Sequence, residues 1–430
     1  MFVNSRRPIV IALLVLLLVG CRARVREPGT LNVWVHSGQS AEREVIEKQV
    51  ERFNARNRDI AVQLTLLPEG SYNAQVQAAA IAGELPDLLE FDGPFVYSYV
   101  WQKNLIPLDK LLPARVRKDL LPSIDEGGTY KGRLYSVGTF DSGLGLYGRR
   151  GLLQAAGARI PTANGEAWTA GEFDRLLEAL ARNDPDGQVL DLKLNYQGEW
   201  FTYAFSPILQ SAGGDLIDRR HYRSARGVLN GRASIAAMER LQSWIQKGYV
   251  DPDIDDAAFV GGRVALSWSG HWVYRDYADA FGDDLVVLPL PNFGRGSKTG
   301  QGSWTWGITA NCSNPKAAAR FLEFLLQPDE VLALASANGA VPGTKRAIVR
   351  SPLYAKDGPL RLFASQLLDR RGVPRPRTPA YPVITDAFGR AFDDIRHALP
   401  VEIALNKAVE TIDLDIQDNQ GYRDSSPTSP

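Results

Sequence analysis

The chain has 430 residues, 49 Lys plus Arg against 49 Asp plus Glu, and 44% hydrophobic residues. This length predicts two or three domains with a sizeable core, and the balanced charge excludes the basic field that nucleic-acid binding needs. Four His and two Cys give no basis for a His/Cys zinc cluster, so we expect neither a metal nor a cofactor.

The first 21 residues are predicted to be an export signal. Arg6 and Arg7 form a basic start, and residues 9–19 are an unbroken apolar run. Eleven residues span about 16 Å as a helix, which is too short to cross a membrane. The LVGC sequence that ends at Cys21 is similar to a bacterial lipobox, which predicts lipidation of Cys21. A cysteine that only ends a cleavable leader is the alternative, and the apolar run favours the general secretory route over the twin-arginine route.

The next segment alternates between strand and helix patterns. Residues 31–35 form a β-prone run, and apolar residues then recur at helical spacing from Ser40. Residues 60–67 alternate as a strand, 72–82 as a helix, and 87–91 as a buried strand. This βαβαβ order predicts a parallel sheet with helices on both faces, the α/β class.

The alternation continues through the rest of the chain without an internal repeat or a long linker. Thr169 and Glu172 form a capping box before an apolar helical stripe, and Asn314 with Pro315 starts another helix. The other expected elements are strands at 264–268 and 284–290, and helices at 238–245, from Pro328, at 383–399 and at 401–416.

Enzyme motifs give little support for catalysis. GLGLYG at 143–148 matches G-x-G-x-x-G, but its mid-chain position in an exported protein favours a close backbone crossing over a dinucleotide loop. The four histidines are scattered without ligand spacing. A glycosidase would need two carboxylates facing each other across a cleft, and the sequence nominates no such pair.

Two pairs of tryptophans lie close together in the sequence, Trp268 with Trp272 and Trp304 with Trp306. An indole ring stacks on the apolar face of a sugar, and polar neighbours can bind the hydroxyl groups. Core tryptophans on two strands are the alternative interpretation, and composition alone leaves both open.

Short motifs recur in a fixed order along the chain. They are LNVW at 31–34, LPDLLEFD at 85–92, LIPLD at 105–109, YKGRLY at 130–135, LLQAAG at 152–157, GGRVAL at 261–266, GHW at 270–272 and LPLP at 288–291. Together they resemble the extracellular solute-binding lipoproteins of bacterial ABC importers, in particular the maltose- and oligosaccharide-binding group. The resemblance covers about residues 31–416.

This resemblance implies an α/β fold of the two-lobed periplasmic-binding-protein type, with the ligand cleft between the lobes. The signal peptide and lipidated cysteine would be 1–21, a tether 22–30, and a polar tail 419–430. Lobe 1 would hold 31–140 and 302–340, and lobe 2 would hold 141–301 and 341–418.

The resemblance also nominates residues that bind the ligand. It implies a role for the turn after the first strand, for the aromatic and carboxylate that end LPDLLEFD, for the crossing segments and for the aromatic of GHW. The candidates are His36, Ser37, Phe91, Asp92, Phe140, Asp141, Trp272, Trp304 and Tyr381.

The function implied by the resemblance is that of a monomeric, lipid-anchored receptor. It would capture a mono- or oligosaccharide on the periplasmic side or outer face of the membrane and deliver it to the transmembrane subunits of an ABC permease. The same fold binding a polyol phosphate or a polyamine is one alternative, and a surface carbohydrate-active enzyme is another. No nucleic-acid partner is expected.

Overall fold

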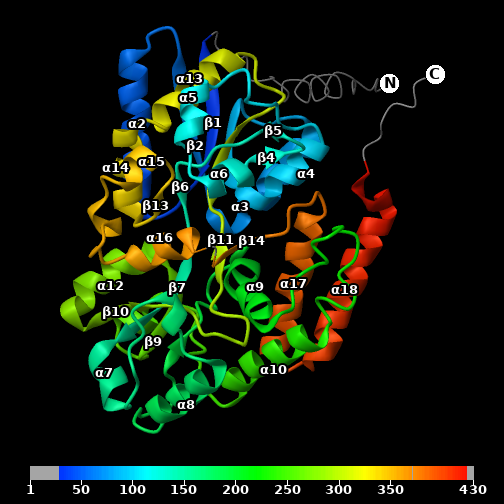
Figure 1. The fold of residues 1–430 in the computed structure, drawn as a ribbon. Helices are drawn as coiled ribbons and strands as arrows, with labels where there is room; N and C mark the ends of the chain where they lie inside the picture. The colour runs from blue at the N-terminus through cyan, green and yellow to red at the C-terminus, as the bar shows by residue number, and fades with distance from the viewer. Residues whose placement is uncertain (1–28, 370, 424–430) are drawn as a thin grey trace, which may run out of the picture.

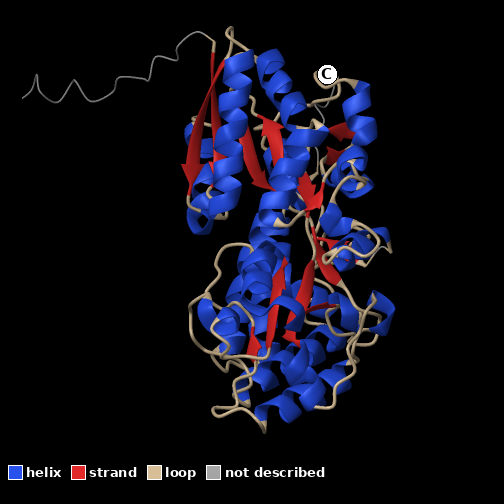
Figure 2. Cartoon of the chain, turned by 90° about the vertical axis from the view of Figure 1, so that its left-hand side faces the viewer, coloured by secondary structure: helices blue, strands red, loops and turns tan. Residues whose placement is uncertain are grey.

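The computed structural model describes residues 29–369 and 371–423. The expected signal peptide, Cys21 and nearly all of the tether lie outside the described residues, as does the tail beyond 423. Figure 1 shows two lobes stacked end to end, and Figure 2 shows that strands in each lobe are flanked by helices. Within the described residues, no helix combines the length and the apolar character needed to cross a membrane.

The first lobe is built on a four-stranded sheet in the order β12-β3-β1-β2. Strands β1 (Thr30–His36), β2 (Ala61–Leu67) and β3 (Leu88–Asp92) run parallel, and β12 (Trp304–Ile308) joins antiparallel to β3. All five β3 residues are buried, as expected for a strand covered on both faces. The predicted βαβαβ opening is therefore confirmed, with α2 (Ser40–Arg56) and α3 (Glu69–Ala82) as its helices.

The second lobe has its own sheet in the order β10-β7-β9-β8. Here β7 (Leu144–Arg149) pairs antiparallel with both β9 (Leu266–Gly270) and β10 (Leu285–Leu288), and only β8 (Leu190–Asp191) is parallel to its neighbour. The strands predicted at 264–268 and 284–290 are confirmed. The pattern of the sequence did not predict the antiparallel pairing, because buried strands of either direction are apolar on both faces.

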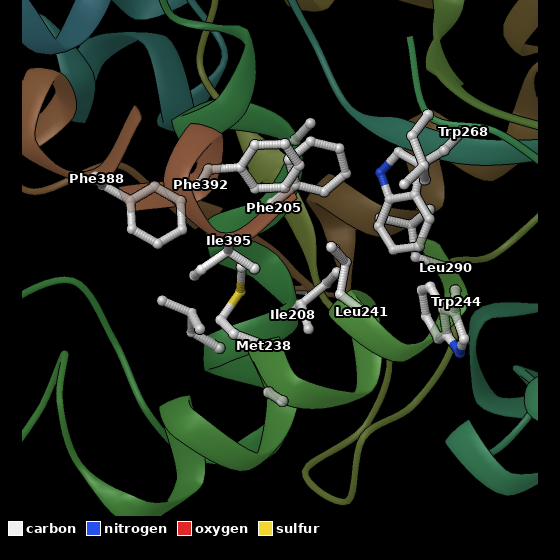
Figure 3. Packing of buried hydrophobic residues seen from close by; sticks show 14 of the residues in the cluster. Phe205, Ile208, Met238, Leu241, Trp244, Trp268, Leu290, Phe388, Phe392 and Ile395 are labelled. Carbon is white, nitrogen blue, oxygen red and sulfur yellow. The ribbon is translucent and has the colours of Figure 1, made fainter. Parts of the chain in front are cut away.

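Helices pack against each sheet through apolar faces. The capping box of Thr169 starts α8 (Ala170–Ala181), and Asn314 caps α13 (Pro315–Leu325), as predicted. In the second lobe, α9 (Trp200–Ala212) and α17 (Tyr381–Arg396) stack Phe205 on Phe392 with ring centroids 4.3 Å apart. Figure 3 shows this core, with Trp268 and Trp244 at its other end.

Two short ladders lie between the sheets (Figure 1). Strand β6 (Phe140–Asp141) pairs antiparallel with β13 (Val341–Pro342), and β11 (Thr299–Gln301) pairs parallel with β14 (Gly372–Pro374). The lobe boundaries expected near 140, 302 and 340 stay a prediction, and these ladders are the segments in which hinge torsions would act.

The remaining elements complete the two lobes. The helices are α4 (Val96–Trp101), α5 (Ala114–Asp119), α6 (Pro122–Gly127), α7 (Arg150–Ala155), α10 (Arg232–Gln246), α11 (Ala257–Val260), α12 (Tyr274–Phe281), α14 (Pro328–Asn338), α15 (Lys345–Ile348), α16 (Arg361–Leu368) and α18 (Val401–Asp418). Strands β4 (Thr129–Tyr130) and β5 (Arg133–Leu134) form a hairpin, and 3-10 turns are η1 (Gly93–Phe95), η2 (Asn164–Glu166), η3 (His271–Val273), η4 (Gly282–Asp284), η5 (Pro352–Tyr354) and η6 (Gln420–Tyr422).

Candidate functional site

A cleft of about 450 Å³ lies between the two lobes. One wall comes from the carboxyl ends of β1 and β3 and the first turns of α2 and α3, which is where open α/β sheets bind ligands. The other wall comes from the loop before α9 and from η3, and the crossing strands form the floor. Side chains that line it include His36, Glu42, Glu69, Asn73, Asp92, Phe140, Asn195, Tyr196, Glu199, Trp200, Tyr203, Trp272, Trp304 and Arg375.

His36 and Trp304 form a parallel ring stack in the first wall. Their ring centroids are 3.8 Å apart and the two ring planes are parallel. The ring of Tyr72 meets the Trp304 ring edge-on, with the centroids 5.2 Å apart. The Nδ1 atom of His36 lies 2.6 Å from the carboxylate of Glu90. Burial alone would lower the pKa of His36, but the charge and hydrogen bond of Glu90, with help from Glu42, raise it to about 9. His36 is therefore an imidazolium at neutral pH, and its stack on Trp304 is a cation–π contact that fixes the indole.

The raised pKa of His36 predicts a pH-dependent stability. The pKa rises on folding from 6.5 to about 9, so the stabilisation is complete below pH 6.5 and is lost as the pH rises through 9. The free energy of unfolding is expected to fall by up to about 3 kcal/mol across this window. Urea titrations between pH 6 and pH 10 measure the fall, and the His36→Gln variant should lack it. An equal slope in the variant and the wild type would contradict this assignment.

Arg375 joins the two walls at the floor of the cleft. Its guanidinium pairs with both carboxylate oxygens of Asp92, at 3.0 and 2.5 Å, and with Glu199 at 2.8 Å. Asp92 ends β3 of the first lobe, whereas Glu199 is the N-cap residue of α9 in the second. The Tyr381 hydroxyl also donates to Glu199, and the guanidinium lies 5.0 Å from the centre of the Tyr203 ring. A single buried arginine thus holds one carboxylate from each lobe.

The second wall is aromatic. Trp272 donates from Nε1 to the Tyr196 hydroxyl at 3.3 Å and meets Trp200 edge-on at 6.0 Å. Gly270 makes room for this indole, since a Cβ atom there would lie 2.0 Å from the Trp272 ring. Trp272 is only partly buried, so part of its ring faces the cleft.

His271, next to Trp272, has a structural role instead. Burial lowers its pKa to about 4, so the ring is neutral. Its Nδ1–H donates to the carbonyl oxygen of Asn338 at 2.8 Å, which leaves Nε2 to accept from the Ser142 hydroxyl at 2.9 Å. The ring therefore ties η3 to the crossing segment after β6 and to the end of α14.

The cleft contains five of the nine residues nominated from the sequence. His36, Asp92, Phe140, Trp272 and Trp304 all line it, although they come from positions up to 268 residues apart. Their roles in ligand binding stay predictions. The lipidation predicted at Cys21 falls outside the described residues.

The other four nominated residues do not line the cleft. Phe91 is fully buried against Tyr99, because side chains alternate along β3 and Asp92 takes the cleft side. Tyr381 is buried as well, and it reaches the cleft through its hydrogen bond to Glu199 and through its ring, whose centre lies 6.0 Å from the Arg375 guanidinium. Ser37 sits outside the cleft lining, and Asp141 lines a smaller adjacent cavity of about 60 Å³.

Sequence reasoning missed several charged and polar residues of the cleft. Glu42 and Glu69 begin the helices that follow β1 and β2, so their position after parallel strands was a usable signal. No local pattern marked Glu199, Trp200 or Arg375, because tertiary packing alone brings them to the cleft.

Comparisons with known proteins agree with this architecture. A family model described as bacterial extracellular solute-binding protein matches residues 48–360. An uncharacterized lipoprotein encoded in the oleD 5' region of Streptomyces antibioticus is 24% identical over 423 residues, covering 92% of this chain and 91% of that protein.

Solved structures resemble the fold over nearly the whole chain. The GacH receptor of Streptomyces glaucescens, solved unliganded and with acarbose, superposes with a TM-score of 0.75 at 20% identity, covering 93% of this chain and 100% of that one. The maltose/maltodextrin-binding domain MalE of Bdellovibrio bacteriovorus, bound to maltotriose, gives 0.76 at 19% identity, covering 90% and 100%.

Proposed function

The chain belongs to the bacterial extracellular solute-binding proteins, and from that premise we propose that it captures a mono- or oligosaccharide in the interlobe cleft for delivery to an ABC permease. One observation carries the proposal: a 450 Å³ cleft that places tryptophan rings beside hydrogen-bonding side chains from both lobes. Aromatic faces and polar edges are what a sugar ring needs. The solved relatives with acarbose and maltotriose support this class of ligand.

The arrangement of the carboxylates supports a receptor over an enzyme. Asp92 and Glu199 face each other across the floor, but both are bound to the Arg375 guanidinium. A glycosidase needs one carboxyl group free to give a proton and another free to attack or to activate water. We infer that this pair holds the lobes together, and that a bound sugar leaves the protein unchanged.

The location and partners follow from the family and remain part of the proposal. We place the protein on the outer side of the membrane, anchored through lipid on Cys21, as a monomer that docks on its permease. The lipoprotein description of the Streptomyces antibioticus relative supports the anchor.

A thermal-shift screen tests the proposed function. Residues 22–430 would be heated with a panel of mono- and oligosaccharides. A ligand present at 100 times its dissociation constant adds about 2.7 kcal/mol to the free energy of unfolding, so a true ligand is expected to raise the Tm by several degrees. Chromatography of the recovered sugar should show it unchanged. A panel in which no saccharide raises the Tm would contradict the proposal, and a released product would favour the enzyme.

A further inference from the structure

The cleft is strongly biased toward negative charge. Five carboxylates line it and only two cationic side chains do, and none of the described lining residues is a lysine. The carboxylates are Glu42, Glu69, Asp92, Glu199 and Asp256, and the cations are His36 and Arg375.

Both cations are already engaged by acidic partners of the protein. Glu90 holds His36, and Arg375 is shared between Asp92 and Glu199. Lys193 is buried beside the cleft residue Asp256, where its ammonium contacts Asp191 at 3.0 Å and Asp256 at 3.3 Å. Among the described residues that line the cleft, no cation is therefore left to receive a phosphate or a carboxylate of a ligand, and the excess of carboxylates repels both.

Unused hydrogen-bond acceptors lie on both walls of the cleft. Glu69 and Asn73 are four residues apart on α3, so they share one helix face, and both line the cleft. Within the described part of the chain, the buried Oδ1 of Asn73 has no partner, and the carboxylate of the exposed residue Glu69 makes no hydrogen bond or ion pair with another side chain. Across the cleft, the buried Oδ1 of Asn195 also has no partner.

The environment of Glu69 favours a cationic partner. Partial desolvation and the nearby charges of Asp92 and Glu90 raise the pKa of Glu69, even though His36 acts in the opposite direction and the side chain keeps access to solvent. Because Glu69 is exposed in the cleft, a positive group can reach this carboxylate, and it would supply the ion pair that no described side chain makes with Glu69. An ammonium group carries three N–H donors and no acceptor, which matches a carboxylate on the same helix face as the amide oxygen of Asn73.

We infer that the cleft takes a saccharide that carries a protonated amine, with the ammonium group at Glu69 and Asn73 and the sugar ring against the aromatic wall. This inference rests on the proposed function and narrows its ligand class. The inference also argues against a polyol phosphate, one of the two non-sugar alternatives, because the described lining of the cleft offers no free cation to bind the phosphate.

Calorimetric titration with matched sugars tests the inference. The probes are mono- and disaccharides of glucose, galactose and mannose, each in the amine, N-acetyl, neutral and uronate form. The amine forms are expected to bind tightest, and raising NaCl from 20 to 200 mM should weaken them, since the contact is between opposite charges. In the Glu69→Gln variant the tightest amine form should lose on the order of tenfold in affinity. Glu84→Gln, an exposed position just after the same helix, is the matched control and should bind like the wild type.

Each result of this titration is decisive. Preference for a neutral or uronate form, or an amine form that binds Glu69→Gln as tightly as the wild type, overturns the amine inference while the sugar-binding function stands. If none of the four forms of any of these sugars binds, both the amine inference and the proposed function are overturned.

Discussion

Replacing Arg375 by methionine is expected to lower the free energy of unfolding by about 3–5 kcal/mol, because the change leaves two buried carboxylates without their cation. Asp92 and Glu199 have side chains only 11% exposed, and both carboxylates are bound to this guanidinium. Methionine replaces the apolar stem of the arginine side chain and removes the charged guanidinium with its donors. Urea unfolding monitored by tryptophan fluorescence measures the loss.

Two further variants control for this interpretation. Arg377 lies two residues further along and pairs with the exposed Glu126 at 3.4 Å, so Arg377→Met should cost less than about 1 kcal/mol. The triple variant Arg375→Met, Asp92→Asn, Glu199→Gln removes all three charges and should recover part of the loss, since burying an uncharged amide costs much less than burying an unpaired carboxylate. Equal losses for Arg375→Met and Arg377→Met would show that the buried network does not stabilise the fold.

Trp268 and Trp272 are expected to have different roles. Trp268 should stabilise the fold, and Trp272 should bind the ligand. Trp268 is 1% exposed and packs beside Phe205 in the core of the second lobe (Figure 3), so Trp268→Ala is expected to cost about 3–5 kcal/mol of stability. Trp272 lines the cleft, and removing its ring should cost about 1–3 kcal/mol of affinity for the best saccharide of the screen.

The two variants serve as controls for each other. Trp272→Ala should melt near the wild type without ligand, and Trp268→Ala should keep its affinity at a temperature where it is folded. Thermal melts and calorimetry on the same preparations separate the two effects. Normal sugar binding by Trp272→Ala would contradict the predicted role of Trp272, and of the aromatic wall around it, in binding the sugar.

Local sequence patterns predicted most individual elements of the fold. The capping box at Thr169, the Asn314 cap and the helices near 383–399 and 401–416 are all present, because caps and apolar stripes depend on residues within a few positions of each other. Trp268 could be assigned to the core for a similar reason, since it lies inside a short apolar strand. Trp272 follows that strand, and a strand end is where a cleft forms.

The sequence by itself determined the α/β class and the order of the elements, and the family resemblance supplied the candidates at strand ends such as His36 and Asp92. Tertiary structure alone decided the strand directions in the second sheet, the burial of Phe91 and the meeting of Asp92, Glu199 and Arg375. The physical reason is the range of each interaction. Periodicity and capping act over a few residues, whereas Asp92, Glu199 and Arg375 come from segments more than 100 residues apart and act on one another only once both lobes have folded.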